Sequence, residues 1–256
     1  MYLLAETELM KISSRETESN GAEFIVEPLS PGYGVTLGNA VRRVMLSSLE
    51  GSAVTAVKID GVTHEFTNVD NMREDIVEFV LNLKSLPVKL HGDESTTLVL
   101  DVKGPGEIKA KDFNGNSDVE IIDPEHFLMT LNKGGKIKAE VTVEKGRGYV
   151  SAEKRSDEKA PLGTILIDSI FTPIKKVNFE VENTRVGSVT NFDKLIINVT
   201  TNGSISPFDA FKNANQILVD HFTIVKDNIV IPEPPKAKSK AKSKAKPKTA
   251  KTDKKK

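Results

Sequence analysis

Three segments with a helical repeat of apolar residues, separated by longer stretches of strand-like alternation, constrain the fold of this chain most strongly. The expected strands are short and bounded by glycine or proline, at residues 23–26, 53–59, 98–102, 137–143 and 195–199. Alternation with a period of two is typical of strands that bury one face. Strand-like segments are concentrated between Leu98 and Asp168, with few helical segments among them. We therefore expect an α+β fold with a β-rich unit inserted between the first and third helices.

The first two helices are expected at about residues 36–49 and 71–84. An apolar stripe that recurs every three to four residues predicts one buried face on each helix. The first helix has the stripe Leu37, Val41, Val44, Met45 and Leu49, flanked by Asn39, Arg42 and Arg43. The second has the stripe Met72, Ile76, Val80 and Leu83, with Glu74 and Asp75 in its first turn and Pro87 beyond its end.

The third helix has the clearest start signal. Ser206 can cap it, Pro207 suits the first helical position, and Asp209 completes a spacing that resembles a capping box. The apolar face that follows consists of Phe208, Phe211, Leu218, Phe222 and Val225. One small domain need not bury all of the stripes on the first and third helices. We therefore expect these helices to form a homodimer interface.

The formal net charge of zero hides a strong asymmetry along the chain. Residues 236–256 contain 11 of the 36 basic side chains and one of the 36 acidic ones, a net charge of +10, so residues 1–235 carry −10. This lysine-rich segment contains almost nothing that could form a core, and we expect it to be disordered. The prolines among residues 232–235 predict a stiff spacer, so the folded part should end near Ile231.

Composition excludes several functional classes. The chain has no cysteine, which excludes thiolate metal sites and cysteine nucleophiles. The histidines, His64, His91, His126 and His221, are far apart without a second ligand at helical spacing, so we expect no metal site. The first residues lack a signal-peptide pattern, and no apolar stretch approaches the roughly 20 residues of a membrane span. We therefore expect a soluble, cytoplasmic protein.

A glycine-rich segment at residues 31–48 opens the first helix, as phosphate-binding loops do. Its spacing does not match, because a dinucleotide fingerprint would need glycine at Leu37 and a P-loop would need Gly-Lys-Ser/Thr. Glycines that permit a tight entry to a packed helix are the favoured interpretation. Arg42 and Arg43 fit either a solvated face or a contact with a protein partner, and the residues alone leave both open.

The segment 145–150, Lys-Gly-Arg-Gly-Tyr-Val, resembles a small anion-binding turn, but glycines between strands more often make a connection with positive φ. No serine, histidine and acid are spaced as in a nucleophilic triad, so a small-molecule enzyme is the weaker hypothesis. The residues alone therefore indicate an α+β protein with interaction helices, an inserted β unit and a basic tail.

Residues 27–49 followed by 53–66 closely resemble the bacterial RNA polymerase alpha-subunit family. Further similar segments follow in the same order at 74–84, 145–150, 193–197 and 201–207. Several collinear motifs across residues 5–228 are far more specific than any one of them.

The resemblance implies a dimerisation domain of residues 1–50 and 174–231, an inserted β-rich domain of 51–173, and a linker and tail of 232–256. It implies a homodimer that scaffolds the beta and beta-prime subunits. The catalytic magnesium lies in those large subunits, so no catalytic residue and no cofactor is expected here. Arg43 matches the position that contacts beta, and Lys84 matches a beta-prime contact. The expected dimer interface comprises Leu37, Val41, Val44, Met45, Phe211, Leu218 and Phe222.

Family members typically continue into a compact C-terminal DNA-binding domain, where this sequence has only the lysine-rich tail. We expect no promoter recognition through such a domain. The tail could attract DNA nonspecifically, in a nucleoid-associated enzyme, or could merely solubilise the chain. An alternative function is a free-standing nucleic-acid-binding protein that uses the tail and keeps the acidic body for oligomerisation.

Overall fold

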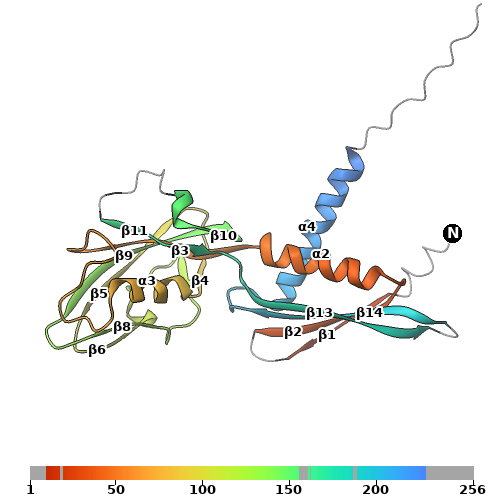
Figure 1. Cartoon of the computed structure of the whole chain (residues 1–256), viewed down its shortest axis with the longest axis horizontal. Helices are drawn as coiled ribbons and strands as arrows, with labels where there is room; N and C mark the ends of the chain where they lie inside the picture. Colours follow the sequence, from red (N-terminus) through yellow and green to blue (C-terminus); the bar gives the residue numbers. More distant parts are fainter. Residues whose placement is uncertain (1–9, 18–19, 156–160, 162, 187–188, 229–256) are drawn as a thin grey trace, which may run out of the picture.

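The computed structural model describes residues 10–17, 20–155, 161, 163–186 and 189–228. Figure 1 shows an elongated molecule with two lobes, joined where β3 (Glu50–Ile59) and β13 (Ile174–Val186) approach each other. We call them the two-helix lobe and the strand-rich lobe. The predicted linker and tail, residues 232–256, lie outside the described residues.

The two-helix lobe contains one antiparallel sheet with the strand order β1-β2-β14-β13. Its strands are β1 (Lys11–Glu16), β2 (Gly21–Leu29), β13 (Ile174–Val186) and β14 (Val189–Thr201). Alternate residues of β2, including Phe24 and Val26, are buried, because one face of the sheet packs against helices. Helix α2 (Tyr33–Ser47) lies along the sheet, whereas α4 (Pro207–Asp227) projects away from it (Figure 1).

The strand-rich lobe is built on the antiparallel sheet β11-β3-β9-β5, with three two-stranded sheets β10-β12, β4-β7 and β6-β8. Its elements are β3 (Glu50–Ile59), α3 (Ile76–Ser85), β4 (Val88–Leu90), β5 (Thr96–Lys103), β6 (Gly106–Lys109), η1 (Ala110–Asp112), β7 (Val119–Ile121), β8 (Phe127–Leu131), β9 (Lys136–Arg147), β10 (Tyr149–Val150), η2 (Ala152–Arg155), β11 (Thr164–Leu166) and β12 (Ser169–Ile170). In β9, buried Ile137, Ala139 and Val141 alternate with exposed Lys136, Lys138 and Glu140.

Each lobe has its own hydrophobic cluster. One includes buried residues from Val54 to Ile167, and the other combines residues from Ala22 to Leu49 with residues from Ile174 to Ala214. The two chain segments that connect the lobes lie against each other at Gly51 and Phe171. A Cβ atom on Gly51 would collide with the carbonyl oxygen of Phe171. The mixed architecture agrees with the expected α+β class. The exact domain boundaries remain a prediction.

All five strand segments expected from alternation lie within observed strands. The helices differ at their starts. Helix α2 begins three residues earlier than the predicted Thr36, and α3 begins at Ile76 with Asp75 as its N-cap. Asp75 accepts a hydrogen bond from the N–H of Glu78 at 2.7 Å. It therefore lies just before the first turn, whereas the prediction places it within that turn. The start of α4 is confirmed: Ser206 caps the N–H of Asp209, and Pro207 is the first helical residue.

Candidate functional site

Helix α2 begins without a side-chain cap of its own, because Gly32 occupies the N-cap position. Gly32 has a φ of 86°, a left-handed conformation that glycine adopts without steric penalty. Asp193 of β14 supplies the missing acceptor. Its Oδ2 atom accepts hydrogen bonds from the N–H of Gly32 at 2.8 Å and from the N–H of Gly34 at 3.0 Å. These N–H groups, which a bound phosphate would need, are therefore already occupied by the protein's own carboxylate.

Two further glycines let α2 lie close against the sheet. A Cβ atom on Gly34 would lie 2.8 Å from Val181, and one on Gly38 would lie 2.5 Å from the ring of Phe179. Both distances are shorter than real Cβ contacts, so a larger residue would push the helix away from β13. The glycine-rich segment thus combines the predicted tight entry at Gly32 with close helix–sheet packing at Gly34 and Gly38.

The predicted interface residues of α2 are divided between interior and surface. Val41 and Met45 are 3% and 0% exposed and belong to the hydrophobic cluster of the two-helix lobe, against which Val44 also packs. The structure therefore places Val41 and Met45 in the protomer's own core, where they have no surface to offer a second copy. The exposed large apolar residues of this helix are Tyr33, Val35, Leu37 and Leu46.

Arg42 and Arg43 both lie on the exposed side of α2. Within the described residues, neither guanidinium forms a hydrogen bond or an ion pair. A planar, charged group without an intramolecular partner is well suited to bind a carboxylate or a carbonyl group of another protein. The geometry is compatible with the predicted contact role of Arg43, which stays a prediction.

Helix α4 packs against the lobe only as far as Leu218. Phe211 stacks on Phe24 of β2 with ring centres 4.2 Å apart, and Phe208 meets the same ring edge-on at 5.5 Å. Ala210 and Ala214 are fully buried against the sheet. Of the predicted interface residues, Phe211 and Leu218 pack partly against the protomer's core, whereas Phe222 is 67% exposed. From Val219 onward every described residue of the helix is exposed.

Lys84 lies in the last turn of α3, where a distant acid holds it. Its Nζ donates to Oδ2 of Asp168 at 3.0 Å, and Oδ1 of Asp168 accepts from the N–H of Ala152 at 2.9 Å. Hydrogen bonds from Ala152 and Lys84 hold the pKa of Asp168 below its ordinary value, so this carboxylate stays charged at neutral pH. Asp168 therefore ties α3 to η2 and fixes Lys84 at the surface. The sequence offers no local signal for this role of Asp168.

Exposed apolar side chains lie beside this ion pair. Tyr149 and Ile170 are paired across β10 and β12, and they are 57% and 48% exposed. The Nζ of Lys84 lies 5.9 Å from the centre of the Tyr149 ring. Loss of hydration and the contact with Asp168 raise the pKa of the Tyr149 hydroxyl, which therefore remains a hydrogen-bond donor. An exposed tyrosine paired with an exposed aliphatic side chain is typical of a protein-binding surface, because aromatic residues are enriched in interfaces.

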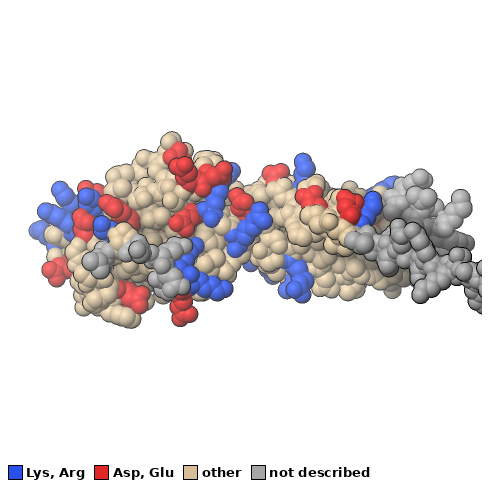
Figure 2. All heavy atoms as spheres, turned by 90° about the horizontal axis from the view of Figure 1, so that it is seen from above, with Lys and Arg blue, Asp and Glu red and all other residues tan. Residues whose placement is uncertain are grey.

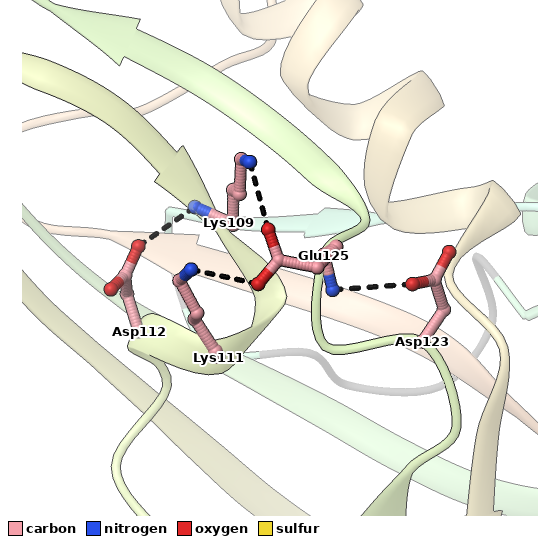
Figure 3. A network of polar contacts seen from close by, with 5 residues as sticks. All are labelled: Lys109, Lys111, Asp112, Asp123 and Glu125. Atoms are coloured by element: carbon pink, nitrogen blue, oxygen red, sulfur yellow. Dashed lines mark hydrogen bonds and ion pairs between the residues drawn. The ribbon is translucent and has the colours of Figure 1, made fainter.

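A separate charged cluster in the strand-rich lobe contains two lysines and one glutamate (Figure 3). Glu125 accepts hydrogen bonds from Lys111 at 2.7 Å and from Lys109 at 2.9 Å. Lys111 and Lys109 lower the pKa of Glu125 to about 2. A carboxylate with such a low pKa is a poor proton acceptor at neutral pH, so this cluster has the character of a surface ion-pair network.

The histidines make local contacts. His126 Nε2 lies 3.0 Å from the carbonyl of Asn82, His221 Nδ1 lies 2.7 Å from the carbonyl of Ile217, and His91 lies 3.5 Å from Glu120. The described part of the chain contains no group of three or more His, Asp or Glu side chains arranged to hold a metal ion. It also contains no helix that is both long and apolar enough to cross a membrane.

Most of the chain is similar in sequence to known proteins. Residues 57–172 match the family of the RNA polymerase Rpb3/RpoA insert domain. The chain is 48% identical over 221 residues to the DNA-directed RNA polymerase subunit alpha of Moorella thermoacetica, an alignment that covers 86% of this chain and 71% of that protein. It is 49% identical over 223 residues to the same subunit of Clostridium kluyveri, with the same shares covered. The chain belongs to the family of bacterial DNA-directed RNA polymerase alpha subunits.

As an RNA polymerase alpha subunit, the chain functions in transcription. The matched insert, residues 57–172, lies within the range 51–173 predicted for it. Nothing in these similarities supports the alternative of a free-standing nucleic-acid-binding protein. Acidic and basic side chains are interspersed on the face shown in Figure 2, without a continuous basic area over the described residues.

Proposed function

We propose that this alpha subunit is a non-catalytic scaffold of a nucleotidyltransferase, which forms a homodimer and recruits the beta and beta-prime subunits. The observation that carries the proposal is the C-terminal end of α4, where every residue from Val219 to Asp227 is exposed. The exposed fractions of Val219, Phe222, Ile224 and Val225 are 57%, 67%, 60% and 61%. Such a helix end is marginal in water, because helices in proteins are stabilised mostly by packing of an apolar face. A second protomer would supply that packing.

Helix α2, which contacts α4 within the protomer, supports the same interface. Its exposed apolar side chains, Tyr33, Val35, Leu37 and Leu46, lie on the lobe from which α4 projects (Figure 1). In a symmetric dimer the same patch is used twice, so α2 of one protomer can cover α4 of its partner. The interface that we propose includes Leu37, Leu218 and Phe222 and leaves Val41 and Met45 in the protomer's core.

Recruitment of the large subunits would use two basic positions on different lobes. Arg43 is exposed on α2 and is proposed to contact beta. Lys84 is held by Asp168 beside Tyr149 on the strand-rich lobe and is proposed to contact beta-prime. No catalytic or cofactor-binding role is proposed for any residue of this chain. The enzyme is expected to act in the cytoplasm, in association with the nucleoid.

The test of the scaffold is reconstitution from purified subunits. The wild-type chain should sediment as a dimer, capture beta, and then capture beta-prime. Arg43→Ala should leave the dimer intact and weaken capture of beta on the order of thirtyfold, since loss of a desolvated arginine contact typically costs about 2 kcal/mol or more. Arg42→Ala, which removes a neighbouring arginine that is also exposed, is the matched control and should capture beta normally. Capture of beta by Arg43→Ala at wild-type affinity would contradict the proposed role.

A further proposed contact involves DNA. Residues 236–256 carry a net charge of +10, which is sufficient to attract phosphates without reading sequence. This segment lies outside the described residues, so the proposal rests on its charge alone.

A further inference from the structure

The turn His64–Thr67 presents Phe66 to solvent. The N–H of Thr67 donates to the carbonyl of His64 at 3.2 Å, and Thr67 Oγ1 lies 3.2 Å from His64 Nδ1. Phe66 is 77% exposed, more than any other large apolar side chain in the described residues. It belongs to neither hydrophobic cluster. An aromatic ring held at the tip of a closed turn is the kind of side chain that anchors protein interfaces.

Among the described residues, β11 is the last strand of its sheet and pairs with β3 alone, so the backbone groups on its other side are open. Ile165 pairs with Val57, and the N–H of Ile167 donates to the carbonyl of Thr55 at 2.9 Å. In an antiparallel ladder, the residue between two hydrogen-bonded pairs directs its N–H and C=O away from the partner strand. Leu166 therefore offers one donor and one acceptor on the open side, which is what an added strand requires.

A groove of about 420 Å³ joins these two features. It is lined by Thr63, His64, Glu65, Phe66, Ala152, Glu153, Thr164, Ile165 and Leu166. One wall is the Phe66 turn and the other is the open edge of β11. The charged residues of the lining are acidic, Glu65 and Glu153, with His64 beside them.

We propose that an extended segment of beta-prime adds as a strand to the open edge of β11, with an apolar side chain packed on Phe66. This inference deepens the proposed scaffold function and rests on it. The groove is continuous with the Lys84 site, because Ala152 lines the groove and also donates its N–H to Asp168, the partner of Lys84. The acidic lining predicts that the segment carries a lysine or arginine beside its apolar residue.

Phe66→Ala tests the aromatic anchor. The variant should fold and capture beta normally, because the side chain is outside both clusters, but it should bind beta-prime on the order of thirtyfold more weakly. Ile12→Ala removes an exposed apolar side chain, 59% exposed, from the edge strand of the other lobe and should change nothing. If Phe66→Ala instead impairs the dimer or the capture of beta, the groove has a different occupant and the proposal is wrong.

Amide hydrogen exchange tests strand addition directly. The N–H of Leu166 should exchange rapidly in the dimer with beta and become protected when beta-prime binds. Leu166→Pro removes this outward N–H without removing a hydrogen bond to β3, and it should weaken capture about fivefold to tenfold. An unprotected Leu166 amide in the full assembly would overturn the proposal. Failure of the wild-type chain to capture beta-prime at all would instead refute the scaffold function, so the two failures are distinguishable.

Discussion

At the scale of single residues, the position of α2 depends on the absence of a side chain at Gly38. A Cβ atom there would lie 2.5 Å from Cδ2 of Phe179. We predict that Gly38→Ala destabilises the chain by about 1–3 kcal/mol, the usual cost of overpacking, because either the ring or the helix must shift. Gly115→Ala is the control, since a Cβ there meets nothing within 4 Å. Urea unfolding measures both. Equal stability of the two variants would show that α2 tolerates a wider spacing.

A second residue-scale prediction concerns acid stability. The pKa of Asp168 is lowered below its ordinary 3.8 by hydrogen bonds from Ala152 and Lys84. A lowered pKa in the folded state contributes stability that is complete above pH 3.8 and is lost as the pH falls through the lowered pKa. Asp168→Asn should therefore lower the melting temperature at pH 7, and the difference from wild type should shrink below about pH 4.

Lys84→Met provides the matched background for this measurement. When Lys84 is absent, Asp168 keeps only the hydrogen bond from Ala152 and the contact with Tyr149, so Asp168→Asn should cost less than in the wild-type chain. Thermal unfolding at several pH values checks both effects. A pH-independent effect of Asp168→Asn would mean that the substitution acts through packing and that the charge is unimportant.

At the scale of secondary-structure elements, features set by neighbouring residues were predictable from the sequence. Ser206, Pro207 and Asp209 give the start of α4 because all of their interactions lie within one turn. The strands were predictable because alternation is also a pattern of neighbouring residues, as in β9, where every buried residue is apolar. Of the two glycines in the segment 145–150, Gly148 has the expected positive φ, 65°, whereas Gly146 lies within β9 and does not.

Features set by distant residues were not predictable. Helix α2 starts at Tyr33 because Asp193, 161 residues from Gly32, binds its first N–H groups. Residues before α3 stay outside the helix because Glu74 accepts hydrogen bonds from the N–H and hydroxyl of Thr130. Apolar periodicity also could not separate Met45, which faces the protomer's own sheet, from Leu37, which faces solvent. The same helical stripe contributes residues both to the protomer's core and to its exposed surface.

The exposed end of α4 supports an element-scale prediction. Phe222→Asp should convert the dimer to a monomer, because a charge would be buried without a partner at a cost of several kcal/mol. The fold of the protomer should persist, since Phe222 is 67% exposed in the single chain. Leu218 is less informative, because it packs partly against the protomer's own cluster. Analytical ultracentrifugation measures the oligomeric state, and circular dichroism checks that the protomer stays folded.

Ile12→Asp is the control for this substitution, since it places the same charge on a residue that is 59% exposed on β1. It should remain dimeric. A folded, dimeric Phe222→Asp variant would show that the end of α4 lies outside the interface.

At the scale of the whole molecule, the distribution of charge separates protein binding from DNA binding. The body up to residue 235 carries −10, and the face shown in Figure 2 mixes acids and bases, so this acidic body is not suited to follow a nucleic-acid backbone. Many of its exposed large apolar residues lie instead on α2, on α4 and, as Tyr149 and Ile170, beside Lys84, and these are surfaces proposed for the second protomer and the large subunits. Attraction to DNA would then fall to residues 236–256.

The salt dependence of DNA binding tests whether residues 236–256 contact DNA. Each lysine that neutralises a phosphate of duplex DNA contributes about −0.9 to the slope of log affinity against log salt concentration, so engagement of half of the lysines would give a slope near −5. The segment contains 11 lysines. Deletion of residues 236–256 from the assembled enzyme should flatten the slope and leave the dimer and subunit capture unchanged. A chain of unchanged length with these lysines replaced by glutamine should behave like the deletion, because the effect depends on charge. If all three enzymes bind random DNA equally at low and moderate salt, these lysines do not contact DNA.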